Sequence, residues 1–103
     1  MIIKETDYFK NWIRALKDLT ARAIINARIR RLSLGNKGDC KYVGDGVSEL
    51  RVDHGPGYRV YFTQEGQKVT IILCGGDKST QSSDISRAKQ IASALEVIEN
   101  EKD

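Results

Sequence analysis

The chain has 103 residues, of which 40% are hydrophobic and 30% are charged, and its formal net charge is +3. This length fits one domain over residues 1–103, and a composition with one proline and nine glycines argues against a disordered chain. No apolar run approaches the roughly 20 residues that cross a bilayer, and the N-terminus does not resemble a secretory signal, so we expect a cytoplasmic protein without membrane contact.

Thiol and imidazole groups are scarce in this chain. It contains two cysteines, Cys40 and Cys74, and a single histidine, His54. These are too few for a Cys/His metal site, and a cytoplasmic disulfide is not expected. No spacing supports a nucleophilic Cys/His pair, and Cys74 is better explained as a buried free thiol. We therefore expect no metal and no cofactor.

Charge is distributed unevenly along the chain. Residues 1–95 carry 16 basic and 10 acidic side chains, whereas residues 96–103 carry one basic and four acidic side chains. Most of the chain is therefore more basic than the net charge implies. A basic body suggests a polyanion or an acidic protein as partner, and a solvated surface with a mild basic excess is the alternative.

The first half predicts a short strand followed by two helices. Ile2–Glu5 is the strand, and Thr6 suits the N-cap of a helix of about 13 residues. Thr20 suits the N-cap of a second helix, which the glycine-containing segment 35–39 ends. Three-and-four spacing places these residues inward: Phe9, Trp12, Ile13, Leu16, Leu19, Ile24, Ile25, Ile29 and Leu32. The two helices, joined by a short link, form a helical hairpin.

The second half predicts three strands. Residues 47–52 (VSELRV) and 58–63 (YRVYFT) alternate as half-buried antiparallel strands do, and the glycines of residues 54–57 suit a hairpin turn between them. One face receives Ser48, Leu50, Val52, Tyr58, Val60 and Phe62, and the other receives Val47, Glu49, Arg51, Arg59, Tyr61 and Thr63. A second turn falls at residues 65–67. Residues 69–74 (VTIILC) are almost continuously apolar, which indicates a central strand covered on both faces, and Gly75 and Gly76 then break it.

A last helix is predicted over roughly residues 81–99. Its apolar stripe consists of Ile85, Ala88, Ile91, Ala92, Leu95 and Ile98. The order β-α-α-β-β-β-α predicts an α+β fold with a small twisted antiparallel sheet, an N-terminal helical hairpin and a C-terminal helix. We expect the helices on one face of the sheet, so that Glu49, Arg51, Arg59 and Tyr61 lie on the other.

Arg51 and Arg59 share that second face on adjacent strands, and Lys78 follows the strand after them. Guanidinium groups suit phosphate because two N–H groups meet two oxygens, and the Lys78 ammonium can serve the same anion. Tyr61 offers a ring for stacking on a base. For each residue alone the alternative is structural: solvated charges for Arg51, Arg59 and Lys78, and a good strand former for Tyr61.

Acid–base groups near this face are few. His54 lies in the turn and is a candidate general base, because imidazole titrates near neutral pH; a solvent-exposed turn residue is the alternative. Glu49 stands beside two arginines, so we expect it to act as their charge partner and not as a base.

Two long motifs carry a resemblance to a known family. They are GVSELRVDHGPGYRVYF at residues 46–62 and LCGGDKSTQSSDISRA at residues 73–88. With the order of elements, they resemble the addiction-module killer proteins of the HigB-like, phage Gp49-related branch of the RelE/ParE toxin superfamily. The resemblance covers nearly the whole chain and implies a RelE/ParE-like fold.

The resemblance implies a toxin of a type II toxin–antitoxin system. Many RelE-like members cleave mRNA in the ribosomal A site without a metal. Each is neutralised by an antitoxin, in the HigB branch typically a helix-turn-helix protein, through which a larger complex can assemble on operator DNA.

The resemblance also implies roles for individual residues. Arg59 matches the arginine aimed at the scissile phosphate, Arg51 a basic strand position beside it, and Lys78 a second cationic position. Ser82, Ser83 and Asp84 stand where RelE-like enzymes have a tyrosine, and Ser48 and Glu49 replace a lysine pair. Because HigB-type enzymes often use histidine or acidic residues, His54 and Asp84 are the candidates for the general base.

Three functions therefore stay open from the sequence. The first is a ribosome-dependent endoribonuclease, which the three cations favour. The second is a ParE-like inhibitor of DNA gyrase that cleaves no RNA. The third is an inactive superfamily member held by its antitoxin.

Overall fold

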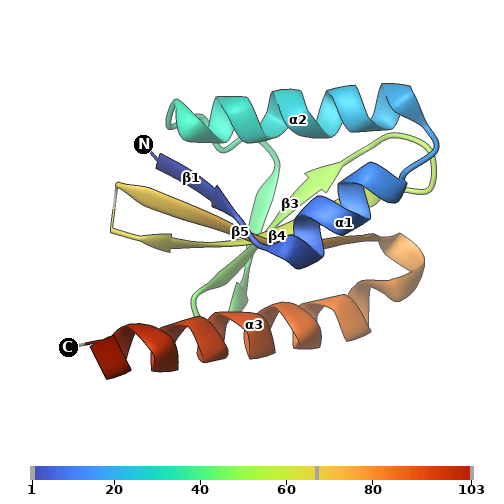
Figure 1. Ribbon diagram of the computed structural model, residues 1–103. Helices are drawn as coiled ribbons and strands as arrows, with labels where there is room; N and C mark the ends of the chain where they lie inside the picture. The colour runs from blue at the N-terminus through green and yellow to red at the C-terminus, as the bar shows by residue number, and fades with distance from the viewer. Residues whose placement is uncertain (1, 67, 103) are drawn as a thin grey trace.

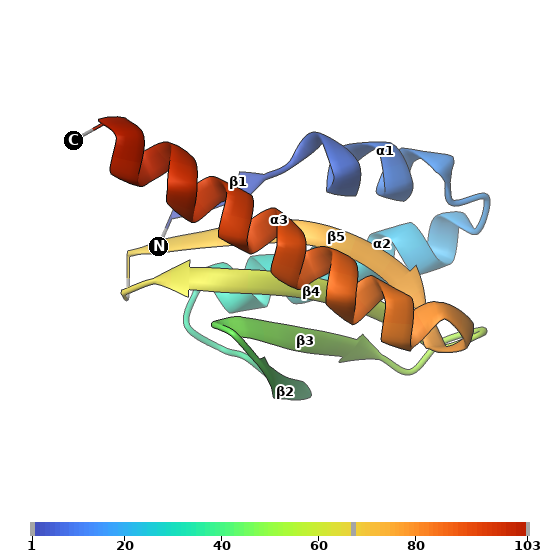
Figure 2. The same ribbon diagram turned by 90° about the horizontal axis from the view of Figure 1, so that it is seen from below.

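A mixed five-stranded sheet with helices on both faces is formed by residues 2–66 and 68–102, the part of the chain that the computed structural model describes (Figures 1 and 2). The elements are β1 (Ile2–Glu5), α1 (Asp7–Ala15), α2 (Leu19–Ser33), β2 (Cys40–Gly44), β3 (Val47–Val52), β4 (Tyr58–Glu65), β5 (Val69–Asp77), the 3-10 turn η1 (Lys78–Thr80) and α3 (Gln81–Lys102). The strand order is β1-β5-β4-β3-β2. The α+β class is confirmed.

The sheet differs from the predicted one in two respects. β1 pairs in parallel with β5, with Ile2 beside Val69, so the sheet is mixed and not wholly antiparallel. An additional strand, β2, pairs antiparallel with β3. The bounds of β1 and β3 are as predicted, whereas β4 and β5 are longer. The turn predicted at residues 65–67 includes Gln67, which lies outside the described residues.

The β2–β3 hairpin depends on a tight turn that the sequence does signal. Gly44, Asp45 and Gly46 have φ angles of 100°, 53° and 79°. Glycine accepts such angles at little cost, and aspartate tolerates them better than most residues. An Asp-Gly pair between apolar residues is a strong hairpin signal, and it identifies the strand that the prediction missed.

The helices begin where polar side chains cap them. Thr6 accepts a hydrogen bond from the backbone N–H of Phe9, as predicted for an N-cap, but α1 ends earlier than predicted because Leu16 is already extended. The second helix is capped by Asp18 and not by Thr20, since the Asp18 carboxylate accepts from the N–H of Ala21. Leu19 consequently starts α2 and is 70% exposed instead of facing inward.

The core is divided between the two faces of the sheet. Buried residues on the α1 and α2 side are Phe9, Ile13, Ala21, Ile25, Ile29, Leu32, Leu50, Val52, Tyr58, Val60, Phe62 and Ile72. Buried residues on the α3 side are Val47, Tyr61, Ile71, Leu73, Cys74 and Ala88. The alternation predicted for both strands is therefore confirmed.

The prediction that all helices share one face is wrong. Figure 1 shows α1 and α2 on one side of the sheet and α3 on the other. The reason is the apolar run of β5, which places Ile72 on one side and Leu73 on the other, so that both faces need cover. Ile85, Ile91, Ala92 and Leu95 of α3 pack on the second face, and the side chain of Ile98 lies outside the described residues. No helix in the described ranges is both long and apolar enough to cross a membrane.

The prediction that Gly75 and Gly76 break the strand is wrong, because both lie within β5. There they let both helical layers approach the sheet closely. A Cβ atom on Gly75 would lie 2.4 Å from the Trp12 ring, and one on Gly76 would overlap the carboxylate of Asp84. Successive residues of a strand point to opposite faces, so one glycine admits α1 and the other admits the start of α3.

We expect Gly75→Ala to lower the free energy of unfolding by roughly 1–3 kcal/mol, because the added methyl group collides with the Trp12 ring. Urea unfolding followed by circular dichroism measures the loss. In a Trp12→Ala background the same substitution should cost much less. Equal losses in both backgrounds would contradict this role of Gly75.

Candidate anion-binding site

A cationic depression of about 480 Å³ lies where β3 and β5 end and β4 begins. Its lining residues are Asp39, Arg51, Asp53, Gly55, Pro56, Gly57, Arg59 and Lys78. The structure thus brings together the three cations that the sequence singled out. Figure 2 shows that α3 starts at this end of the sheet, where β5 ends, and crosses the sheet from there.

Arg51 and Arg59 are direct cross-strand partners in the β3–β4 ladder. Like charges in directly opposite positions repel, so this pair needs compensation. Arg51 receives it from Asp39, whose Oδ1 lies 3.1 Å from Nη2. Arg28 of α2 binds the same end of β3, because its guanidinium group donates a hydrogen bond to the backbone carbonyl of Arg51 at 2.8 Å. The prediction had not included Asp39, because it precedes the strand that was missed.

Arg59 receives its compensation from Glu49. The Glu49 side chain is completely buried, and its Oε1 lies 3.9 Å from Nε of Arg59, whose side chain is 14% exposed. The other carboxylate oxygen, Oε2, accepts hydrogen bonds from the Tyr61 hydroxyl at 3.0 Å and from the Gln81 amide at 2.8 Å. The structure thus supports the interpretation of Glu49 as a charge partner. No sequence signal pointed to Gln81.

Lys78 is placed by the turn that connects β3 with β4. Its backbone N–H donates to the carbonyl of Gly57 at 2.8 Å, which fixes the end of β5 against this turn. Gly57 has a φ of 82°, and a Cβ atom there would lie 3.6 Å from Cβ of Lys78. The glycine therefore serves both the turn geometry and the close approach, and the Lys78 side chain is exposed at the depression.

Tyr61 does not lie on an open face, so the prediction of an exposed stacking ring is wrong. The residue is completely buried beneath α3, among the buried residues of the second face. Burial, together with the Glu49 carboxylate, raises the pKa of its phenol far above the ordinary value of 10.0. Tyr61 is therefore neutral at physiological pH and acts as a hydrogen-bond donor to Glu49.

The two candidate general bases lie in different places. His54 is outside the residues that line the depression, and its Nε2 lies 3.1 Å from Oδ2 of Asp18 at the start of α2. Asp84 lies over Gly76, the residue of β5 that pairs with Arg59, and accepts a hydrogen bond from Thr80. Asp84 therefore lies one strand away from Arg59 and, like His54, outside the residues that line the depression, whereas His54 pairs with the residue that caps α2. A catalytic role for either residue stays a prediction.

Thiol chemistry has no support in this structure. Burial raises the pKa of the Cys74 thiol to about 11, so it stays protonated near neutral pH. Burial also raises the pKa of Cys40. Among the described residues, no three His, Cys, Asp or Glu side chains gather as a metal site would need.

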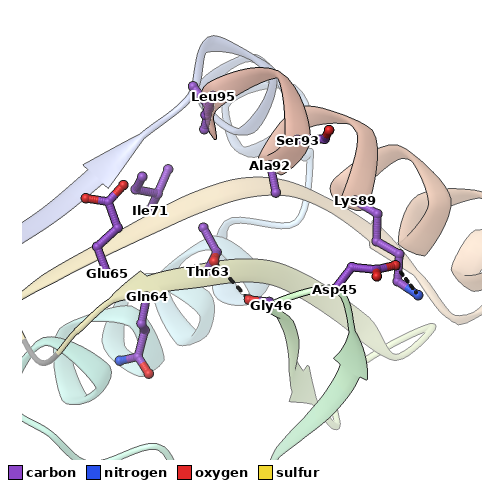
Figure 3. A pocket seen from close by; sticks show the side chains of 10 residues that line it. All are labelled: Asp45, Gly46, Thr63, Gln64, Glu65, Ile71, Lys89, Ala92, Ser93 and Leu95. Atoms are coloured by element: carbon purple, nitrogen blue, oxygen red, sulfur yellow. Dashed lines mark hydrogen bonds and ion pairs between the residues drawn. The ribbon is translucent and has the colours of Figure 1, made fainter. Parts of the chain in front are cut away.

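A larger hollow of about 680 Å³ lies between α3 and the β2–β3 hairpin (Figure 3). Its lysine, Lys89, points to Asp45, with Nζ 3.5 Å from the carboxylate. Gly46 accepts a hydrogen bond from Thr63 in the same wall. None of the predicted site residues lines this hollow, so the cationic depression is the stronger candidate for binding an anion.

Fold and site together define a small α+β protein that presents a cationic depression at one end of a mixed sheet. The model of the phage-derived Gp49-like protein family (DUF891) matches residues 11–99, so the chain belongs to this family. A protein of Haemophilus influenzae (strain Rd) described as uncharacterised is 55% identical over 93 residues, which cover 90% of this chain and 94% of the relative. The Gp49-like family is associated with the toxins of toxin–antitoxin systems, which suggests pairing with an antitoxin.

The Asp18–His54 pair predicts a titration effect. Hydrogen bonds from the Ala21 backbone and from His54 hold the pKa of the Asp18 carboxyl below its ordinary value of 3.8. A carboxyl with a lowered folded-state pKa stabilises the fold above its unfolded-state pKa, and this contribution disappears as the pH falls through the folded-state value.

We expect His54→Ala to raise the Asp18 pKa part of the way to 3.8, because the Ala21 hydrogen bond remains. A ¹³C NMR titration of the Asp18 carboxyl measures this change. An unaltered Asp18 pKa in the variant would show that the imidazole is not held there in solution.

Proposed function

We propose that this protein is a toxin that stops translation by cleaving mRNA in the ribosomal A site. The observation that supports this proposal is that Arg51, Arg59 and Lys78, from three different strand ends, line one depression. A phosphate in this depression can meet two guanidinium forks and one ammonium group, the groups that proteins use most for phosphate.

The chemistry that fits this depression uses the RNA itself as the nucleophile. The ribose 2′-oxygen attacks the adjacent phosphorus while the bond from phosphorus to the 5′-oxygen breaks, which leaves a 2′,3′-cyclic phosphate and a 5′-hydroxyl. Negative charge grows on the phosphate oxygens, and Arg51 and Arg59 stabilise it. Lys78 neutralises the phosphate or protonates the departing oxygen.

Proton removal from the 2′-hydroxyl needs a base, and Asp84 is the better placed of the two candidates. It lies on the same side of the sheet as Arg59, over the paired residue Gly76. The ribosome supplies the rest by holding the mRNA in a reactive geometry, an effect worth several orders of magnitude in rate. A small protein with few acid–base groups is suited to such a substrate.

The partner in this proposal is an antitoxin made by the same system, of the helix-turn-helix type. Its acidic segments complement the basic excess of residues 1–95. Through its own DNA-binding surface the antitoxin would place the complex on operator DNA.

We expect Arg59→Ala to reduce mRNA cleavage by roughly 10²–10³-fold, because it removes a donor to the transition state. The measurement is induction in bacteria followed by mapping of mRNA 5′ ends on translating ribosomes. Arg30→Ala is the matched control, since it removes the same charge from an exposed position of α2 outside the depression.

Codon-phased cleavage by the wild type and by Arg30→Ala, but not by Arg59→Ala, is the expected result. Intact mRNA accompanied by an SOS response and linear plasmid DNA would overturn the proposal in favour of gyrase inhibition. A wild type that does not slow growth would exclude both kinds of toxin.

A further inference from the structure

Glu49 is a completely buried carboxylate in the layer between the sheet and α3. Burying a charged group is costly unless it is paired and hydrogen-bonded. One oxygen, Oε2, is satisfied by two donors, Tyr61 and Gln81. The other oxygen, Oε1, has no hydrogen-bond partner within the described part of the chain.

Arg59 has a buried donor that matches this buried acceptor. Its Nε atom is buried, makes no hydrogen bond to any described residue, and lies 3.9 Å from Glu49 Oε1. The Arg59 side chain is 14% exposed, and the residue also lines the cationic depression. The Nε edge of the guanidinium group therefore faces a fixed carboxylate in a residue that lines the anion site.

We propose that Glu49 is a positioning residue for Arg59, an inference that rests on the proposed binding of an RNA phosphate in the depression. Glu49 Oε1 holds the Nε edge of the guanidinium group, so that the terminal nitrogens are directed at the phosphate. A small shift of about 1 Å converts the 3.9 Å ion pair into a hydrogen bond, which satisfies both buried atoms. Binding of the phosphate on the opposite edge favours this closed arrangement.

Glu49 is itself held by groups from two layers. Tyr61 lies on β4, the neighbouring strand, and Gln81 is the first residue of α3. Both donate to Oε2, which leaves Oε1 pointing to Arg59. The buried carboxylate cannot reach a ribose hydroxyl through this packing, so its effect on the reaction passes through Arg59.

The variant Glu49→Gln distinguishes two roles of Glu49: orienting the Arg59 guanidinium group, and only compensating its charge. The new amide oxygen can still accept from Tyr61 and Gln81, but its NH₂ group then faces the Nε–H of Arg59, so two donors oppose each other. The variant also makes the depression more positive. Charge compensation alone predicts tighter binding of inorganic phosphate and equal or faster cleavage, whereas positioning predicts slower cleavage.

The experiment combines cleavage on ribosomes with NMR of the ¹⁵N-labelled protein. We expect Glu49→Gln to lower the single-turnover cleavage rate about 10–100-fold while ribosome binding is kept, as misplacement of a catalytic group does. The Arg59 Nε–Hε signal, assigned with Arg59→Lys, should be ordered in the wild type and averaged in the variant. Glu65→Gln makes the same change at an exposed residue of β4 outside the depression, so it is the matched control and should keep both.

An equally ordered Arg59 signal in Glu49→Gln, or cleavage at the wild-type rate, would overturn the inference. If the wild type cleaves no mRNA, the proposed function fails, and the NMR comparison still decides whether Glu49 orders Arg59. Should Glu49→Gln not fold, Gln81→Ala loosens the carboxylate without changing its charge. It should then reduce the order of Arg59, and an unchanged signal would contradict the proposal.

Discussion

The need to cover an apolar sheet on both faces determines most of this structure. β5 carries large apolar side chains to either side, so α1 and α2 cover one face and α3 the other. The helix α3 starts at Gln81, whose amide donates to Glu49, at the end of the sheet where β5 ends. Arg51, Arg59 and Lys78 lie at this end of the sheet. The site is therefore at the edge of the second helical layer.

The position of this edge explains why residues on the same face of a strand have such different surroundings. Tyr61 lies under α3 and is completely buried, whereas Arg59, two residues earlier on the same face, borders the depression. Glu49 lies at the boundary, with one oxygen bonded to groups beneath the helix and the other beside an arginine. A cross-strand arginine pair is tolerated here because Asp39 and Glu49 each stand beside one member.

Much of this arrangement could be predicted from local patterns. Strand alternation correctly placed Leu50 and Val60 in the core and Arg51 and Arg59 on the opposite face. Local patterns do not show which face of the sheet a helix covers, so the predicted position of α3 was wrong. Because α3 was placed on the other face, the burial of Tyr61 and Glu49 was not predicted. Gly75 and Gly76 were interpreted as a strand break because a glycine pair does not show what packs against it. Here a tryptophan and a carboxylate do so.

The proposed phosphate site is tested most directly by the structure of the protein bound to a ribosome whose A-site mRNA carries a 2′-O-methyl group, which blocks cleavage. We expect the phosphate after the methylated ribose to lie in the cationic depression, within hydrogen-bonding distance of the Arg59 guanidinium group. A complex in which this depression faces solvent and another surface contacts the mRNA would contradict the proposed site.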